Sequence, residues 1–150
     1  MSLPFNSPQV LEALSRGMIL EANELMGGPY SISASVIHGN HLGRQLGFPT
    51  ANLELPEKKP LLLAHGVYAV KIEFDQAWYK GMANVGIRPT VDGKNLTIEI
   101  NLFDFSGDLY GKKLMVHFIG RIRNEKKFNN LDALVDQLHL DKQQALNLLL

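Results

Sequence analysis

The sequence contains no cysteine. A chain without cysteine cannot form disulfide bonds, build a cysteine-based zinc site or use a thiolate nucleophile, which excludes secreted disulfide scaffolds and zinc ribbons. The 15 Lys and Arg residues balance the 15 Asp and Glu residues, so the formal net charge is zero. This balance provides no general electrostatic attraction to nucleic acid or to an anionic membrane, and we expect neither as a partner.

Long apolar runs and the familiar phosphate-binding motifs are also absent. No apolar run approaches the ~18 residues of a membrane-spanning helix, and the N-terminus lacks the basic region and apolar core of a signal peptide. The sequence therefore predicts a cytoplasmic protein. Neither GxxxxGK[ST] nor GxGxxG occurs, so a nucleotide would have to be bound by a different kind of loop.

Apolar periodicity predicts helices at the two ends of the chain and strands between them. Residues 7–26 carry a helical apolar stripe that Gly17 interrupts. From about Leu131 the pattern is helical again, and Asp141 is predicted as an N-cap that divides this segment into two short helices. Short strands at regular spacing indicate an antiparallel barrel or sandwich with helices packed outside. The strands are predicted at 30–36, 67–72, 78–84, 96–103 and 114–122.

The segment from Gly43 to Asn52 is rich in residues that suit ligand binding and poor in residues that suit a helix or regular strand. Gly43 and Gly47 permit close approach of the backbone to a ligand. Arg44 can meet phosphate, while Thr50 and Asn52 offer oxygens to a metal ion or ligand. We therefore predict a constrained binding loop here.

Glu99 and the segment Arg121–Phe128 each have an ordinary structural explanation beside a functional one. Glu99 shares a strand face with Thr97 and Asn101, and this face is either a solvated surface or a rigid site whose carboxylate accepts a proton from a substrate hydroxyl. Arg121–Phe128 contains four cations followed by an aromatic residue. It is either a solvated strand end or a mobile basic loop that closes over an anionic or aromatic ligand.

Six sequence blocks in a fixed order resemble a known family. The set is similar to riboflavin kinase, the flavokinase module at the C-terminal end of bacterial bifunctional FAD synthetases, over roughly residues 30–149. The resemblance implies a mainly β fold, a six-stranded Greek-key antiparallel β-barrel with a C-terminal helix, preceded here by an N-terminal helical extension. The blocks are Gly39–Asn52, His65–Ala69, Ala83–Thr90, Glu99–Phe105, Leu109–Gly111 and Arg121–Phe128.

The resemblance also implies a reaction, in which the γ-phosphate of ATP is transferred to the ribityl 5′-hydroxyl of riboflavin to give FMN and ADP. Thr50 and Asn52 would help to hold Mg²⁺, or another divalent cation, against the ATP phosphates, and Glu99 would be the catalytic base. The flavin would need an apolar slot, for which residues after Tyr110 and on the C-terminal helix are candidates, although no motif assigns it. The loop over the phosphates would be shaped by Gly43, Arg44 and Gly47. The flap that orders around flavin and nucleotide would include Arg121, Arg123 and Phe128, with Arg123 in direct contact.

The N-terminal region resembles only part of the nucleotidyltransferase domain that precedes the kinase in the bifunctional enzymes. Residues 21–30 match the end of that domain, whereas Pro8 and Leu11 replace the threonine and arginine of its Ser-Ser-Thr-x-x-Arg motif. We therefore expect residues 1–29 to be a helical linker, the remnant of a missing nucleotidyltransferase domain of the parent protein, and residues 30–150 to be the riboflavin kinase domain.

This division leads us to expect no FAD synthesis from this chain alone. The alternative to an active kinase is a non-catalytic module that binds flavin or nucleotide and serves regulation. The presence of Thr50, Asn52 and Glu99 favours the kinase, because a module without activity could lose its metal and base positions before its core.

Overall fold

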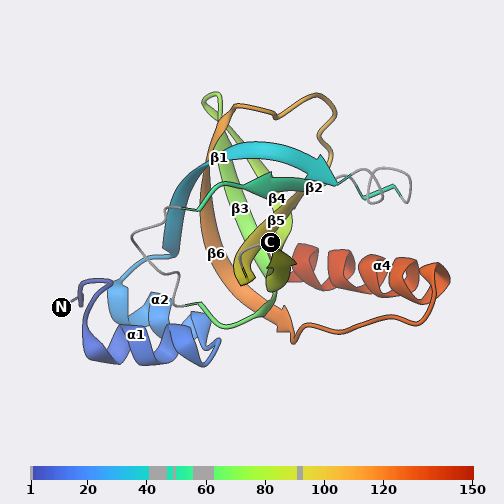
Figure 1. The fold of residues 1–150 in the computed structure, drawn as a ribbon. Helices are drawn as coiled ribbons and strands as arrows, with labels where there is room; N and C mark the ends of the chain where they lie inside the picture. Colours follow the sequence, from blue (N-terminus) through green and yellow to red (C-terminus); the bar gives the residue numbers. More distant parts are fainter. Residues whose placement is uncertain (1, 41–46, 49, 56–62, 91–92) are drawn as a thin grey trace.

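The computed structural model describes residues 2–40, 47, 48, 50–55, 63–90 and 93–150. Its strands are antiparallel and close into a barrel in the order β1-β2-β5-β4-β3-β6 (Figure 1). β2 is followed around the barrel by β5 rather than by β3, which is a Greek-key type of connection. The predicted mainly β barrel is confirmed. The strands are β1 Tyr30–Asn40, β2 Thr50–Leu53, β3 Gly66–Phe74, β4 Ala77–Thr90, β5 Gly93–Leu102 and β6 Lys113–Arg123.

Alternation along the strands fills the barrel with apolar side chains. In β6, Leu114, Val116 and Phe118 are fully buried, whereas Lys113 and Met115, at alternate positions of the strand, are exposed. This is the period of two that a strand imposes on its side chains. The Phe118 ring contacts the rings of Tyr30 and Tyr68, so aromatic contacts link β1, β3 and β6 in the main core cluster.

The N-terminal extension forms two helices rather than the single helix predicted over 7–26. Helix α1 spans Pro8–Ser15 and helix α2 spans Ile19–Met26. Gly17 lies between them with a φ of 76°, a left-handed conformation that breaks the helical hydrogen-bond ladder even though the apolar stripe continues. Both helices contribute fully buried residues to the barrel core. Within the described residues, no helix has the length and apolar character needed to cross a bilayer.

The C-terminal segment is one continuous helix, α4, spanning Leu131–Leu148, so the predicted division at Asp141 is wrong. The N-cap is Asn130, whose side chain accepts a hydrogen bond from the backbone N–H of Ala133 at 2.8 Å. Helix α4 packs Ala145 and Leu149 against residues of β3, β4 and the chain after β5. Asp141 lies within the helix because its carboxylate has a tertiary partner on β6 instead of a local backbone partner.

Strand β2 falls inside the segment predicted as a binding loop. Thr50–Leu53 pairs with β1 on one side and with β5 on the other. Ala51 and Leu53 are buried in the core, so the alternate residues Thr50 and Asn52 occupy the opposite face of the strand. The last part of the predicted loop is therefore regular structure that closes the barrel.

Candidate functional site

Three polar side chains lie side by side across neighbouring strands on the outer face of the barrel. Asn52 of β2 is in register with Glu99 of β5, and Glu99 is in register with Asn84 of β4. Residues directly opposite each other in antiparallel strands have Cβ atoms about 4.5–5.5 Å apart and share a face. Glu99 is only 7% exposed although it does not face the apolar interior. The fold thus buries a carboxylate between two amide side chains.

Thr50 extends this row along β2. It lies two residues before Asn52 and therefore on the same face of the strand. Its hydroxyl oxygen is buried and has no hydrogen-bond partner among the described residues. A buried hydroxyl without a partner is costly for folding. A ligand that accepts a hydrogen bond from this hydroxyl, or a cation that its oxygen coordinates, would remove that cost.

The donor set of this row suits a hard cation. A hydroxyl oxygen from Thr50 and an amide oxygen from Asn52 are ligands of the type that Mg²⁺ takes in proteins, with the remaining positions filled by water or substrate phosphate. The described residues contain no cluster of three His, Cys, Asp or Glu side chains that could hold a metal ion. Two protein oxygens are too few to complete the coordination of such a cation, so water or a substrate phosphate would have to supply the other ligands.

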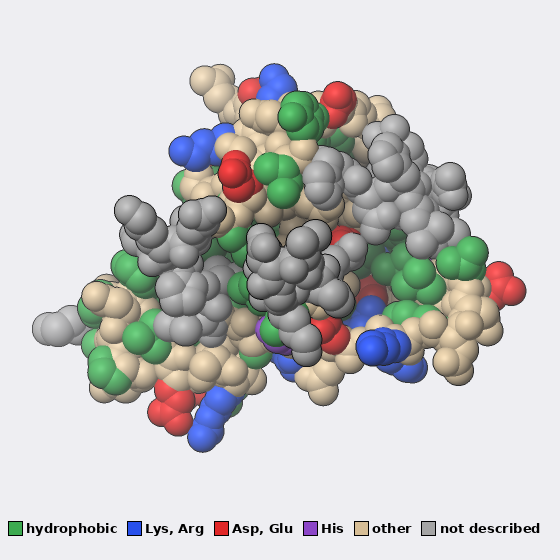
Figure 2. All heavy atoms as spheres, in the orientation of Figure 1, with side chains coloured by type: hydrophobic (Ala, Val, Ile, Leu, Met, Phe, Trp, Pro, Cys, Tyr) green, Lys and Arg blue, Asp and Glu red, His purple; other side chains and the backbone are tan. Residues whose placement is uncertain are grey.

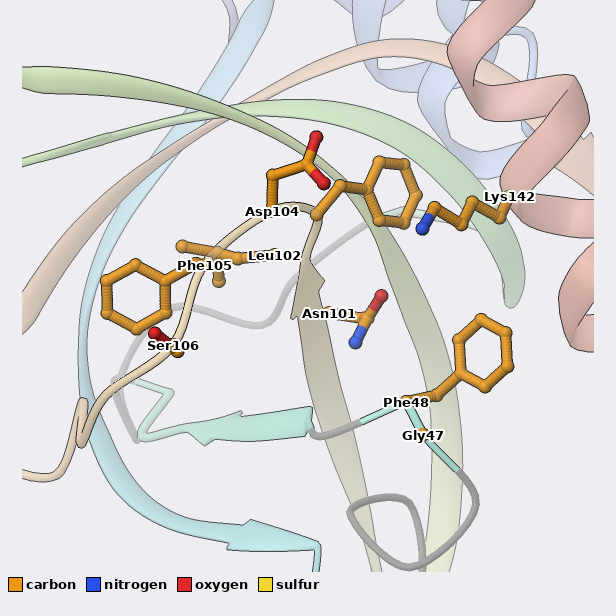
Figure 3. Close-up of a pocket in the computed structure, with 9 residues that line it drawn as sticks. Gly47, Phe48, Asn101, Leu102, Asp104, Phe105, Ser106 and Lys142 are labelled. Atoms are coloured by element: carbon orange, nitrogen blue, oxygen red, sulfur yellow. The ribbon is translucent and has the colours of Figure 1, made fainter.

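A cavity of about 320 Å³ adjoins the row at the end of β5. Asn101 lines it and lies two residues beyond Glu99 on the same strand face, roughly 7 Å along the strand. Lys142 reaches toward the turn after β5 from helix α4, with its Nζ 5.2 Å from the centroid of the Phe103 ring (Figure 3). Small-molecule sites commonly occupy about 300–1,000 Å³. The lining residues are Gly47, Phe48, Asn101, Leu102, Phe103, Asp104, Phe105, Ser106 and Lys142.

Sequence reasoning named the C-terminal helix as one candidate side of a flavin slot, but it did not identify the individual residues that line this cavity. The position of Asn101 beside the site could have been predicted from the sequence, because strand alternation places it on the same face as Glu99. No local pattern in the sequence singles out Lys142, since its position at the cavity depends on how α4 packs against the barrel. Helix α4 also contacts Phe48, because the His139 ring packs edge-on against the Phe48 ring with their centroids 4.9 Å apart.

The predicted phosphate loop is described only in part. Gly43 and Arg44 lie outside the described residues. Gly47 has a φ of 83°, which favours glycine, and no atom lies within 4 Å of the position that a Cβ would take. This residue lines the cavity, so the described end of the predicted loop does border the candidate site.

The predicted flap residues are found in two different places. The Arg121 guanidinium donates to the backbone carbonyl of His65 and lies 5.9 Å from the Tyr68 ring, beside Gly17 and the N-terminal helices. Arg123 instead contacts α4 and lies 5.7 Å from the Phe128 ring. The structure brings Arg123 and Phe128 together and places Arg121 elsewhere, and contact of any of the three with a ligand stays a prediction.

Comparison with known proteins identifies the family. A family model described as "Flavokinase: Riboflavin kinase" matches residues 26–149. The chain belongs to the riboflavin kinase family. Among curated relatives, a bifunctional riboflavin kinase/FMN adenylyltransferase of Bacillus subtilis (strain 168) is 42% identical over 144 residues, covering 94% of this chain and 45% of the relative. A protein of the same name from Haemophilus influenzae is 43% identical over 142 residues, covering 93% and 45%. The chain thus spans about half the length of the curated relatives it matches.

Solved structures agree with the riboflavin kinase assignment of the fold. A riboflavin kinase from Trypanosoma brucei superposes with a TM-score of 0.60 at 27% identity and covers 81% of this chain and 80% of that one. A Streptococcus pneumoniae structure, named as a macrolide-efflux protein, superposes with a TM-score of 0.87 at 40% identity and covers 95% of this chain and 47% of that one. Neither comparison assigns a role to a single residue of the candidate site.

Proposed function

We propose that the chain transfers the γ-phosphoryl group of ATP to the 5′-hydroxyl of riboflavin, which yields FMN and ADP. The observation that carries this proposal is the row Thr50, Asn52 and Glu99 beside a cavity that polar side chains and three phenylalanines line. The row supplies a general base and cation ligands, and the cavity supplies a place for a flat acceptor molecule. Membership of the riboflavin kinase family then selects the reaction among those that such a site could perform.

Glu99 is the proposed general base. Its carboxylate accepts the proton of the 5′-hydroxyl as that oxygen forms a bond to the γ-phosphorus, while the bond between the γ-phosphorus and the β,γ-bridging oxygen breaks and ADP leaves. A carboxylate fixed on a strand needs no reorientation during this step. General base catalysis of this kind contributes about 10²–10⁴ in rate.

Thr50 and Asn52 are the proposed protein ligands of Mg²⁺ or another divalent cation. The buried Thr50 hydroxyl, which lacks a hydrogen-bond partner among the described residues, is the observation that supports this fit. When bound, such a cation neutralises charge on the phosphate oxygens of ATP. The proposed loop over the phosphates, formed by Gly43, Arg44 and Gly47, rests on the sequence resemblance and on the position of Gly47 at the cavity.

The cavity is the proposed site of the isoalloxazine ring. Phe48, Phe103 and Phe105 line it, and Asn101 and Lys142 bring polar groups that suit the ring oxygens and nitrogens. A ring held here would direct its ribityl chain along β5 toward Glu99. Arg121 and Phe128, assigned to the flap by resemblance, keep that assignment as a proposal.

The proposed reaction also implies where the protein works and which molecules it binds. We propose that the protein works in the cytoplasm on riboflavin and ATP, without nucleic acid or membrane, in keeping with its balanced charge. Residues 1–29 are proposed to descend from the end of a nucleotidyltransferase domain. Since the family model describes only riboflavin kinase, we expect no FAD from these 150 residues alone.

The deciding assay incubates the protein with riboflavin, ATP and Mg²⁺ and separates flavins by chromatography. We expect FMN to appear with time, to require ATP and to stop on chelation of the metal. FAD should not appear when FMN replaces riboflavin. Binding of riboflavin without any FMN at saturating substrate would contradict the kinase and favour the non-catalytic module.

A further inference from the structure

A buried ion pair connects the end of the barrel to helix α4. The Arg123 guanidinium donates to both carboxylate oxygens of Asp141, from Nε to Oδ1 at 2.8 Å and from Nη2 to Oδ2 at 2.8 Å. The Asp141 side chain is 1% exposed and that of Arg123 is 18% exposed. A bidentate pair of this kind fixes orientation as well as distance, because the planar fork matches the carboxylate.

All three nitrogen atoms of the Arg123 guanidinium donate a hydrogen bond within the protein. Its Nη1 donates to the backbone carbonyl of Asn124 at 3.0 Å, and Gln137 adds a hydrogen bond of 2.9 Å to Oδ1 of Asp141. Breaking the pair would leave a charge buried without its partner, which is strongly unfavourable. Arg123 is therefore poorly placed to leave Asp141 for a ligand.

The pair also holds one end of residues 124–130, which we call the strap. The strap runs from the end of β6 to the start of α4, and Figure 2 shows Lys and Arg side chains exposed in this region. Its far end is fixed by the Asn130 cap of α4. Arg123 and Lys126 both lie over the Phe128 ring, at 5.7 and 5.6 Å from its centroid. The strap is thus ordered by contacts of the protein with itself.

Helix α4 shapes the cavity on two sides. Lys142, the residue after Asp141, lines the cavity directly. His139, two residues before Asp141, packs edge-on against Phe48, which precedes β2 and also lines the cavity. A shift of α4 relative to β6 would therefore move Lys142 and release Phe48 together.

We propose that Arg123 and Asp141 are positioning residues that set the place of α4 and so the shape of the flavin cavity. Arg123 then acts on flavin binding through Asp141 rather than by touching the ligand, in contrast to the direct contact that the family resemblance implies. This inference rests on the proposed function in taking riboflavin as the molecule that fills the cavity.

The test compares Asp141→Asn with Asp136→Asn. Both remove one carboxylate charge from α4, but Asp136 is exposed whereas Asp141 is buried. Riboflavin affinity is measured by quenching of flavin fluorescence without ATP, and ATP affinity by calorimetry with Mg²⁺, both well below the unfolding temperature of each variant. We expect Asp141→Asn to weaken riboflavin binding about tenfold and ATP binding by less than about twofold. Asp136→Asn should change neither.

A double-mutant cycle separates positioning from direct contact. If Arg123 acts through Asp141, then Arg123→Lys combined with Asp141→Asn will bind riboflavin no more weakly than the weaker single variant. Additive losses would mean that Arg123 touches the ligand independently and would overturn the proposal, as would unchanged riboflavin affinity in Asp141→Asn or an equal loss of ATP affinity.

Two further measurements keep the test decisive. If Asp141→Asn does not fold, Arg123→Lys and Gln137→Leu replace it, since both weaken the pair without removing the buried carboxylate, and unchanged riboflavin affinity in both would overturn the proposal. Riboflavin binding by the unaltered protein without formation of FMN contradicts the kinase alone and leaves the cycle to decide the role of the pair. Absence of riboflavin binding contradicts both.

Discussion

At the scale of single residues, the site depends on polar groups that the fold buries outside the apolar barrel interior. Glu99 lies in register between Asn52 and Asn84, and the Thr50 hydroxyl lies beside them without a partner among the described residues. Polar groups buried in this way cost stability unless they are hydrogen-bonded. Retaining such groups is understandable where they bind a substrate or an ion, which makes their substitution informative.

Glu99→Gln tests the base directly. The amide keeps the shape and much of the hydrogen bonding of the carboxylate but cannot accept the substrate proton, so we expect kcat to fall by about 10²–10⁴. Riboflavin and ATP affinities should change little. FMN formation is followed by chromatography, with the exposed Glu54→Gln at the end of β2 as the matched control. Equal turnover in Glu99→Gln and unaltered protein would remove the proposed role.

Thr50→Val separates a ligand role from a structural one. Valine fills the same volume without the hydroxyl, and the lost hydroxyl has no described partner, so the free energy of unfolding should stay the same or rise by about 1 kcal/mol. Mg²⁺-dependent ATP affinity should nevertheless fall about tenfold, while Thr50→Ser should retain most of it. Calorimetry with and without Mg²⁺ measures this. A loss of affinity that is independent of the metal, accompanied by lower stability, would indicate a structural hydroxyl.

At the scale of elements, local patterns located most strands and missed features that depend on long-range packing. The alternation of apolar and polar residues predicted most of the core strands, and the family resemblance predicted that Thr50, Asn52 and Glu99 belong to one site. β2 escaped detection because Gly and Pro dominate the segment before it, and pairing with β1 and β5 stabilises a strand of four residues. Asp141 was misread because an acidic residue in a helical pattern also suits a cap, whereas its partner Arg123 lies 18 residues away. The cavity wall formed by Lys142 has no local signature.

The turn between α1 and α2 depends on a glycine. Gly17 has a φ of 76°, and a Cβ there would lie 2.6 Å from Nε of Arg121, whose guanidinium is held by the carbonyl of His65. Gly17→Ala should therefore lower the free energy of unfolding by about 2 kcal/mol. Urea denaturation measures the change. Gly28→Ala is the matched control, because it has no atom within 4 Å of the added Cβ and no positive φ, and equal effects of the two substitutions would contradict this account.

At the scale of the whole molecule, the two N-terminal helices and the barrel interior share one core, while α4 packs on a second cluster. Buried residues of α1 and α2, among them Leu14 and Ile19, belong to the same cluster as Tyr68 and Phe118 of the barrel. Asn23 of α2 joins the two parts further, since its side chain donates to the Phe118 carbonyl at 2.7 Å and accepts from the Tyr30 N–H at 2.8 Å. The N-terminal extension, whatever its origin, is therefore expected to unfold together with the kinase barrel.

The buried tyrosines of this shared core predict how global stability depends on pH. Burial raises the pKa of the Tyr68 hydroxyl above its ordinary value of 10.0, although the hydrogen bond and charge of Arg121 act in the opposite direction. Burial likewise raises the pKa of Tyr30. Above about pH 10 the unfolded chain releases these protons while the folded chain keeps them, so the folded state binds more protons and stability falls as pH rises further.

Each such tyrosine contributes a slope of at most about 1.4 kcal/mol per pH unit, between its unfolded and folded pKa values. Tyr68→Phe removes one titrating group from the core, so its stability should decline less steeply above pH 10 than that of the unaltered protein, even though loss of the hydrogen bond to the Ala64 carbonyl lowers stability at neutral pH. Urea denaturation from pH 8 to pH 11 gives both quantities. Tyr110→Phe is the control, because it removes the same hydroxyl from a side chain that is 70% exposed. Identical slopes in Tyr68→Phe and unaltered protein would mean that the core does not resist ionisation of Tyr68.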